Sequence, residues 1–136
     1  MEYFTFKANG RYWGVEARFV HRVLENVPPA RVPFVPACYL GLIYYRGELF
    51  DVVDAANLLS GGTGSLTGKD ARIVLLKWSR HKLALIPDEI IGLVWSGDIK
   101  GDGTVYSHKN HTVRIITPAA MWNSLFGLSY GRSSEV

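Results

Sequence analysis

The residues of this sequence that could do chemistry begin with a charged turn, Arg46-Gly47-Glu48, between two strongly apolar runs. Glycine suits a tight hairpin turn, so the guanidinium of Arg46 should reach solvent at its tip. Arginine presents a planar fork of donors that can bind carboxylates in a bidentate manner. The turn therefore indicates a binding site and not a catalytic set.

Two glycine-containing stretches resemble ligand loops but lack the residues that such loops need. The connector at residues 60–68 runs into Lys69, yet a phosphate-binding loop requires glycine where Thr63 stands, and Ser or Thr at Asp70. Residues 97–103 contain two carboxylates without the spacing of a calcium loop or its later glutamate. Both stretches are better explained as solvated loops.

The histidines give a weak indication of a metal site. His108 and His111 are three residues apart, an interval that can place two imidazoles on one metal ion. No third ligand follows in a recognised pattern, so a structural role is favoured and a metal site stays an alternative. His21 is expected on the exposed side of a helical turn, and His81 at a hairpin tip.

Catalytic residues are not indicated elsewhere. No Ser or Thr lies in a strand-turn-helix elbow, and Cys38 has no neighbouring histidine, so we expect a buried structural thiol. Asp51 and Asp54 could form an acid-base pair, but Asp54 is well placed to cap a helix. The sequence therefore predicts a protein without enzymatic activity, cofactor or metal.

The composition is that of one compact domain. The chain has 136 residues, 48% of them hydrophobic and 20% charged. Its apolar stretches are shorter than the roughly 18–20 residues of a membrane span, and no secretory leader opens the chain, so we expect a soluble intracellular protein. The net charge of +3 comes entirely from the second half and is too diffuse to indicate nucleic acid by itself.

The elements that must position the turn are mostly short strands. Residues 3–7 and 11–15 alternate in polarity around Asn9-Gly10, which predicts a tight hairpin. Apolar residues then recur at helical spacing, which predicts a helical turn from Glu16 to Glu25, before Pro28-Pro29.

This pattern returns seventy positions later, where the segment from Phe4 to Leu24 aligns with the segment from Val74 to Val94. Residues 52–59 have a looser echo from residue 115, and each copy is an apolar strand, a cap residue (Asp54 or Thr117) and a short helix. The repeat predicts an all-β fold with short helices, built as two pseudo-symmetric small barrels.

The repeat also suggests boundaries within a single domain of residues 1–127. The first β subdomain covers about 16–68 and the second about 69–127, each completed by crossing strands, and residues 128–136 are expected to be a disordered tail. Four apolar strand residues are expected in the core: Leu42, Val52, Leu76 and Leu85.

The run from Pro36 to Asp54 resembles the CheW-like family of chemotaxis coupling proteins. The resemblance rests on a proline, then Gly41-Leu42-Ile43, then Arg46-Gly47-Glu48, then an apolar strand that ends in aspartate, and it extends from Tyr3 to about Val94. It implies two SH3-like five-stranded barrels, which form an adaptor without catalysis or cofactor. The implied partners are the cytoplasmic tip of a chemoreceptor and the regulatory domain of a CheA-type histidine kinase. The implied location is the cytoplasm, at membrane-embedded receptor arrays, without insertion into the membrane.

Site residues follow from the same resemblance. Arg46 and Gly47 match the functionally important turn of the family, with Glu48 beside them, while Val20 and Gly41 match positions on surfaces that engage receptor or kinase. The chain departs from the family pattern in a shorter segment between Ser96 and Thr112, which leaves a truncated second subdomain as an alternative.

Two other functions stay open. A small nucleic-acid-binding barrel could use the basic second half together with exposed aromatic residues, although most of the aromatic residues alternate with apolar positions. A small hydrolase would require a pocket lined by converging titratable groups.

Overall fold

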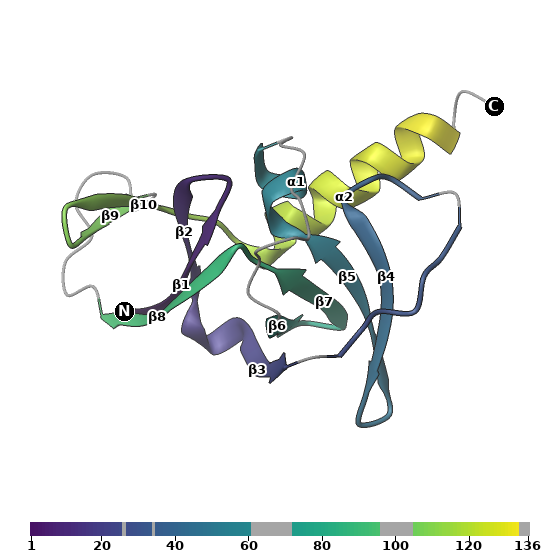
Figure 1. The fold of residues 1–136 in the computed structure, drawn as a ribbon, viewed down its shortest axis with the longest axis horizontal. Coiled ribbons are helices and arrows are strands. Elements are labelled where there is room, and N and C mark those ends of the chain that lie inside the picture. Colours follow the sequence, from purple (N-terminus) through teal and green to yellow (C-terminus); the bar gives the residue numbers. More distant parts are fainter. Residues whose placement is uncertain (26, 34, 61–71, 96–104, 134–136) are drawn as a thin grey trace.

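The computed structural model describes residues 1–25, 27–33, 35–60, 72–95 and 105–133. Within them the chain forms ten strands, two α-helices and one 3-10 helix (Figure 1). In chain order the elements are β1 (Glu2–Ala8), β2 (Arg11–Glu16), η1 (Ala17–Phe19), β3 (Val20–Glu25), β4 (Tyr39–Tyr45), β5 (Glu48–Asp54), α1 (Ala55–Ser60), β6 (Arg72–Trp78), β7 (His81–Ile86), β8 (Glu89–Trp95), β9 (Val105–His108), β10 (His111–Ile115) and α2 (Pro118–Ser133). The connector after Ser60, the Gly68-Lys69 motif and residues 97–103 lie outside the described residues.

The strands form two five-stranded sheets. The first sheet has the order β3-β6-β7-β5-β4, and the second has the order β8-β1-β2-β10-β9. Figure 1 shows them side by side, with α1 and α2 above the first sheet and its junction with the second. The fold is therefore mostly β with two β subdomains, as the sequence predicts. Because the second sheet also has five strands, the alternative of a second subdomain that lacks a strand is wrong.

The sequence repeat is visible in the strands, and the two copies exchange hairpins. Strands β1 and β2 lie seventy positions before β6 and β7. The β1–β2 hairpin pairs with β8 and, in parallel, with β10. The β6–β7 hairpin pairs with β3 and, in parallel, with β5. Each subdomain is thus completed by a hairpin from the other half of the chain.

The largest core lies between the two exchanged hairpins. Its buried members include four pairs of residues related by the repeat, namely Phe4 and Val74, Phe6 and Leu76, Trp13 and Leu83, and Val15 and Leu85. Strands β1 and β6 are buried on both faces, because their alternate residues enter a separate core within each sheet. The hairpins contribute residues both to the core between them and to the core within each sheet. They therefore hold the two subdomains together.

The expected core residues are mostly confirmed. Val52, Leu76 and Leu85 are at most 1% exposed. Leu42 is only half-buried, so that prediction is wrong. Its side chain lies on the outer face of β4, opposite to buried Ile43, since successive side chains of a strand alternate between faces.

The predicted helical turn over residues 16–25 is wrong beyond Phe19, because Val20–Glu25 is strand β3. Strand β3 packs Val20 and Val23 against the core shared by the hairpins, and Leu24 against the core of the first sheet. A strand with apolar residues on both faces has the same spacing as a helix with one apolar face.

Both predicted helix caps are confirmed. The backbone N–H of Ala56 donates to Asp54 Oδ1 at 3.3 Å, and that of Ala120 donates to Thr117 Oγ1 at 3.1 Å. Pro118 takes the first position of α2. Helix α2 continues through Ser133, so the disordered tail expected from residue 128 is helical as far as that residue.

Candidate partner-binding surface

The charged turn forms the tip of the β4–β5 hairpin, which projects from the lower end of the first sheet in Figure 1. Tyr45 pairs with Glu48, and the two residues between them both have left-handed backbone, with φ of 49° at Arg46 and 83° at Gly47. This is the geometry of a two-residue type I′ turn, whose twist matches that of the strands. Glycine adopts it easily, whereas arginine adopts it at a cost.

The guanidinium of Arg46 is exposed, as expected. Its nearest recorded partner is the Tyr45 ring, whose centroid lies 5.3 Å from Cζ. Within the part of the chain that the structure describes, Arg46 forms no ion pair. Its five donors are therefore available to a partner.

Glu48 is held by another strand and not by its turn neighbour. Lys77 on β6 donates to both carboxylate oxygens, at 2.9 and 3.1 Å. These hydrogen bonds hold the pKa of Glu48 below its usual range, with a smaller contribution from the nearby charges of Lys77, Lys82 and His21. Basic side chains of three strands therefore surround the one carboxylate of the turn.

Two exposed apolar side chains flank the turn. Tyr44 on β4 and Leu49 on β5 are directly paired, and they are 70% and 56% exposed. A cross-strand pair on one face of a hairpin lies within contact distance. We call Tyr44, Arg46, Glu48 and Leu49 the turn surface. It combines an apolar pair with a free guanidinium, and tyrosine and arginine are enriched at the energetic centres of protein interfaces.

The structure places Gly41 away from this tip, and Val20 beside His21, whose ring centroid lies 6.2 Å from that of Tyr45. Gly41 is buried, and a Cβ built on it would lie 2.2 Å from the carbonyl oxygen of Ala30, whose backbone crosses β4 there. Roughly 13 Å of strand separates Gly41 from Tyr45. Val20 is half-buried at the start of β3, against the shared core. Gly41 thus allows the backbone at Ala30 to pass close to β4, and it has no side chain to offer a partner.

The exposure of Tyr44 and Leu49 was not predicted from the sequence. The strand alternation contains the signal, because Ile43 and Phe50 must face inward if their neighbours face out. In a run as apolar as residues 39–53, the sequence alone does not show which alternate residues face inward. That depends on which face of the strand is covered by other elements.

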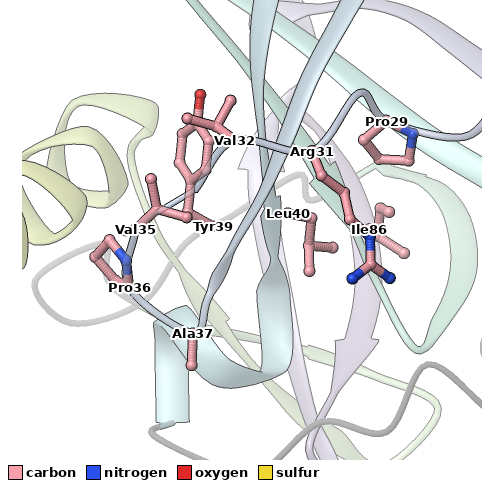
Figure 2. A pocket seen from close by; sticks show the side chains of 9 residues that line it. All are labelled: Pro29, Arg31, Val32, Val35, Pro36, Ala37, Tyr39, Leu40 and Ile86. Carbon is pink, nitrogen blue, oxygen red and sulfur yellow. The ribbon is translucent and has the colours of Figure 1, made fainter.

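A hollow of about 440 Å³ lies at the opposite end of β4, under the segment that crosses it. Figure 2 shows Arg31 beside Leu40 and Ile86, with Val32 near the ring of Tyr39. The Tyr39 hydroxyl donates to Asp51 Oδ1 at 2.5 Å, and burial together with this bond raises the pKa of Tyr39. None of the predicted site residues lines this hollow.

The structure also shows where the other residues with potentially reactive side chains lie, namely Asp51, Asp54, Cys38, His108 and His111. Asp51 accepts the Tyr39 hydrogen bond and Asp54 caps α1, while Cys38 is 1% exposed. His108 and His111 face each other across a hairpin turn. Among the described residues, no three His, Cys, Asp or Glu side chains are grouped as metal ligands would be.

Both the sequence and the fold of the chain match known proteins. The model of the CheW-like domain matches residues 2–120. The fold is shared with the scaffolding protein TtCheW from Thermoanaerobacter tengcongensis, with a TM-score of 0.67 and 20% identity over 85% of this chain and 82% of that one. No curated protein matches the chain. In the described part, neither helix is long and apolar enough to cross a membrane. Since the family model covers most of the sequence, the chain belongs to the CheW-like domain family.

Proposed function

We propose that the chain is a non-catalytic adaptor that couples chemoreceptors to a CheA-type histidine kinase, and that the turn surface binds one of these partners. Membership of the CheW-like family supports a coupling role in chemotaxis in general. The observation that carries the finer proposal is the state of Arg46, an exposed guanidinium without an ion pair among the described residues.

The chemistry of the turn surface favours a partner that is acidic at its edge and apolar at its centre. Tyr44 and Leu49 supply apolar contact area, and tyrosine is common at the energetic centres of interfaces. Arg46, Lys77 and Lys82 make the end of the subdomain basic. A partner carboxylate that pairs with Arg46 would be desolvated there, where such a pair is worth more than on an open surface.

The other site residues contribute differently to the proposal. Gly47 allows the type I′ turn that presents Arg46, and Glu48 anchors the turn to β6 through Lys77. Gly41 keeps the crossing segment close to β4. Val20 would contribute a half-buried apolar contact on β3. The protein would act in the cytoplasm and join receptor arrays through its partners, without inserting into the membrane.

The experiment replaces Arg46 with asparagine. Asparagine tolerates left-handed backbone, and Asn-Gly is a preferred sequence for type I′ turns, so Arg46→Asn removes the guanidinium and keeps the hairpin. The matched control is Arg11→Asn, which removes another exposed arginine next to a hairpin turn, on the other sheet. Each full-length variant is titrated with a receptor cytoplasmic-tip fragment and with a kinase regulatory domain by calorimetry.

We expect Arg46→Asn to weaken one of the two complexes about tenfold or more, with thermal stability equal to or above that of the parent. The Arg11→Asn variant should bind both partners as the parent does. A folded Arg46→Asn protein with unchanged affinity for both partners would show that the turn surface is not a docking site. Weak binding of any DNA or RNA with a steep salt dependence, and none of either partner, would favour the nucleic-acid barrel.

A further inference from the structure

The outer end of the second sheet carries a basic hollow that the adaptor role does not use. It has a volume of about 520 Å³ and lies between the β1–β2 turn and the β9–β10 turn. Arg11 from β2 and Arg114 from β10 both line it. The two strands are neighbours and run parallel, which brings these arginines to one surface.

The register shows that both arginines lie on one face of the sheet. Val113 is fully buried and pairs with Tyr12, so its neighbours Thr112 and Arg114 point to the opposite face of the sheet. Arg11 precedes Tyr12 and is exposed on that same face. Arg11 and Arg114 therefore lie on the same face as the buried Trp13, where they are exposed at the end of the sheet with the Thr112 hydroxyl beside them.

No described residue neutralises either arginine. Among the residues that the structure describes, Arg11 and Arg114 form no ion pair, and no Asp or Glu lines the hollow. At the adjoining β1–β2 turn, Asp88 Oδ2 accepts a hydrogen bond from the backbone N–H of Asn9 at 2.7 Å. Two positive charges thus have no counter-charge from the described part of the chain, which favours an anionic ligand.

The strands that carry the two arginines are also held together on the opposite face of the sheet. There the rings of Tyr12 and His111 stack with their centroids 4.3 Å apart, and Lys7 Nζ lies 5.7 Å from the Tyr12 centroid. The Asn110 amide, at the tip of the β9–β10 turn, adds a donor at the rim. A second hollow of about 450 Å³ shares Thr112 and Arg114 and continues over apolar residues of the same sheet.

We propose that this hollow binds a phosphoryl group, carried by a small molecule or by a lipid headgroup. Guanidinium groups bind phosphate oxygens in a bidentate manner, and hydroxyl and amide donors satisfy the remaining lone pairs. The adjoining hollow has room for the organic part of a phosphate ester. The proposal does not depend on the turn surface, which lies on the other sheet.

The test measures binding of inorganic pyrophosphate by calorimetry, with the full chain, for the parent, Arg11→Gln, Arg114→Gln and the double variant. The matched control is Arg80→Gln, which removes the same charge at a distant hairpin tip. Sedimentation with phosphatidylcholine vesicles that contain phosphatidic acid separates a lipid source from a soluble one. Thermal unfolding without ligand verifies that each variant is folded.

We expect each single variant to weaken binding about tenfold, the double variant to abolish it, and Arg80→Gln to leave it unchanged. Binding of vesicles but not pyrophosphate, lost in the double variant, would assign the site to a lipid headgroup and support the proposal. Absence of binding to both probes, or equal weakening by Arg80→Gln, would overturn it. Binding restricted to long nucleic acids would overturn it as well.

Discussion

Lys77 donates two hydrogen bonds to Glu48, at 2.9 and 3.1 Å, although Arg46 stands two residues before that glutamate in the same turn. The lysine comes from β6, a strand of the exchanged hairpin. Because Lys77 takes the carboxylate of the turn, the guanidinium of Arg46 stays available to a partner. Assembly of the first subdomain around the exchanged hairpin and exposure of the proposed binding residue Arg46 are therefore connected.

The Glu48–Lys77 pair predicts a pH dependence of stability. Since the folded state holds the pKa of Glu48 below its usual range, the pair stabilises the fold above the pKa of Glu48 in the unfolded chain. This contribution is lost as the pH falls through the lower pKa of the folded state. We expect Lys77→Met to lower the melting temperature near neutral pH and to approach the parent in acid, as followed by thermal unfolding over that range.

The control for this prediction is Lys82→Met, since Lys82 acts on Glu48 by charge alone and forms none of its recorded hydrogen bonds. Its effect should be smaller at every pH. A Lys77→Met difference that stays constant from neutral to acid pH would contradict the assignment.

The burial difference between two leucines predicts unequal costs of truncation. Leu85 is 1% exposed in the core between the hairpins, so Leu85→Ala should cost about 2–5 kcal/mol. Leu42 is half-buried on the outer face of β4, and Leu42→Ala should cost less than about 2 kcal/mol. Chemical denaturation of both variants measures the two costs. Equal costs would show that Leu42 is as buried as Leu85.

Alanine substitutions at two glycines can distinguish the stability cost of backbone strain from the cost of a steric clash. Gly41 has a φ of 133° and its Cβ would meet the Ala30 carbonyl, whereas Gly10 has a φ of 74° and nothing within 4 Å of its Cβ. We expect Gly10→Ala to cost about 1 kcal/mol and Gly41→Ala about 3 kcal/mol or more, by denaturant unfolding. If Gly41→Ala loses partner binding while its stability matches that of Gly10→Ala, Gly41 has a direct role at the interface.

Local features of the fold could be predicted from the sequence because each depends on neighbouring residues. Asn9-Gly10 does form a two-residue turn with both φ values positive, and Asp54 and Thr117 do cap helices. The repeat of seventy residues is also a property of the chain alone. Of the site, the same kind of local reasoning located the exposed turn at Arg46 and Gly47.

Features that depend on pairing across the fold could not be predicted. The exchange of hairpins places Lys77 beside Glu48, twenty-nine residues apart, and no local pattern indicates that contact. It also decides the faces of β3, since Val20 and Val23 pack against the shared core while Leu24 packs against the core of the first sheet. The apolar spacing there agrees with a helix equally well, so only tertiary packing decides between the two.

The second subdomain achieves a similar fold with a different core, which explains why the repeat is faint in the sequence. Where the first sheet buries Leu75 and Ala84, the second has Thr5 and Gly14 at the equivalent positions, seventy residues earlier. Tyr106 fills this space, since a Cβ on Gly14 would lie 2.5 Å from its hydroxyl.

The buried hydrogen bond in this core predicts a coupled pair of substitutions. The hydroxyls of Thr5 and Tyr106 lie 2.5 Å apart, Thr5 is fully buried, and burial raises the pKa of Tyr106. Tyr106→Phe should cost about 1–3 kcal/mol because it leaves the threonine hydroxyl without this partner. Thr5→Val removes the other half of the bond and should cost a similar amount.

In the double variant, Thr5→Val with Tyr106→Phe, neither polar group is left without its partner, so its cost should fall below the sum of the two single costs by about 1 kcal/mol or more. Denaturant unfolding of the four proteins gives this coupling energy, and strictly additive costs would show that the two hydroxyls do not depend on each other.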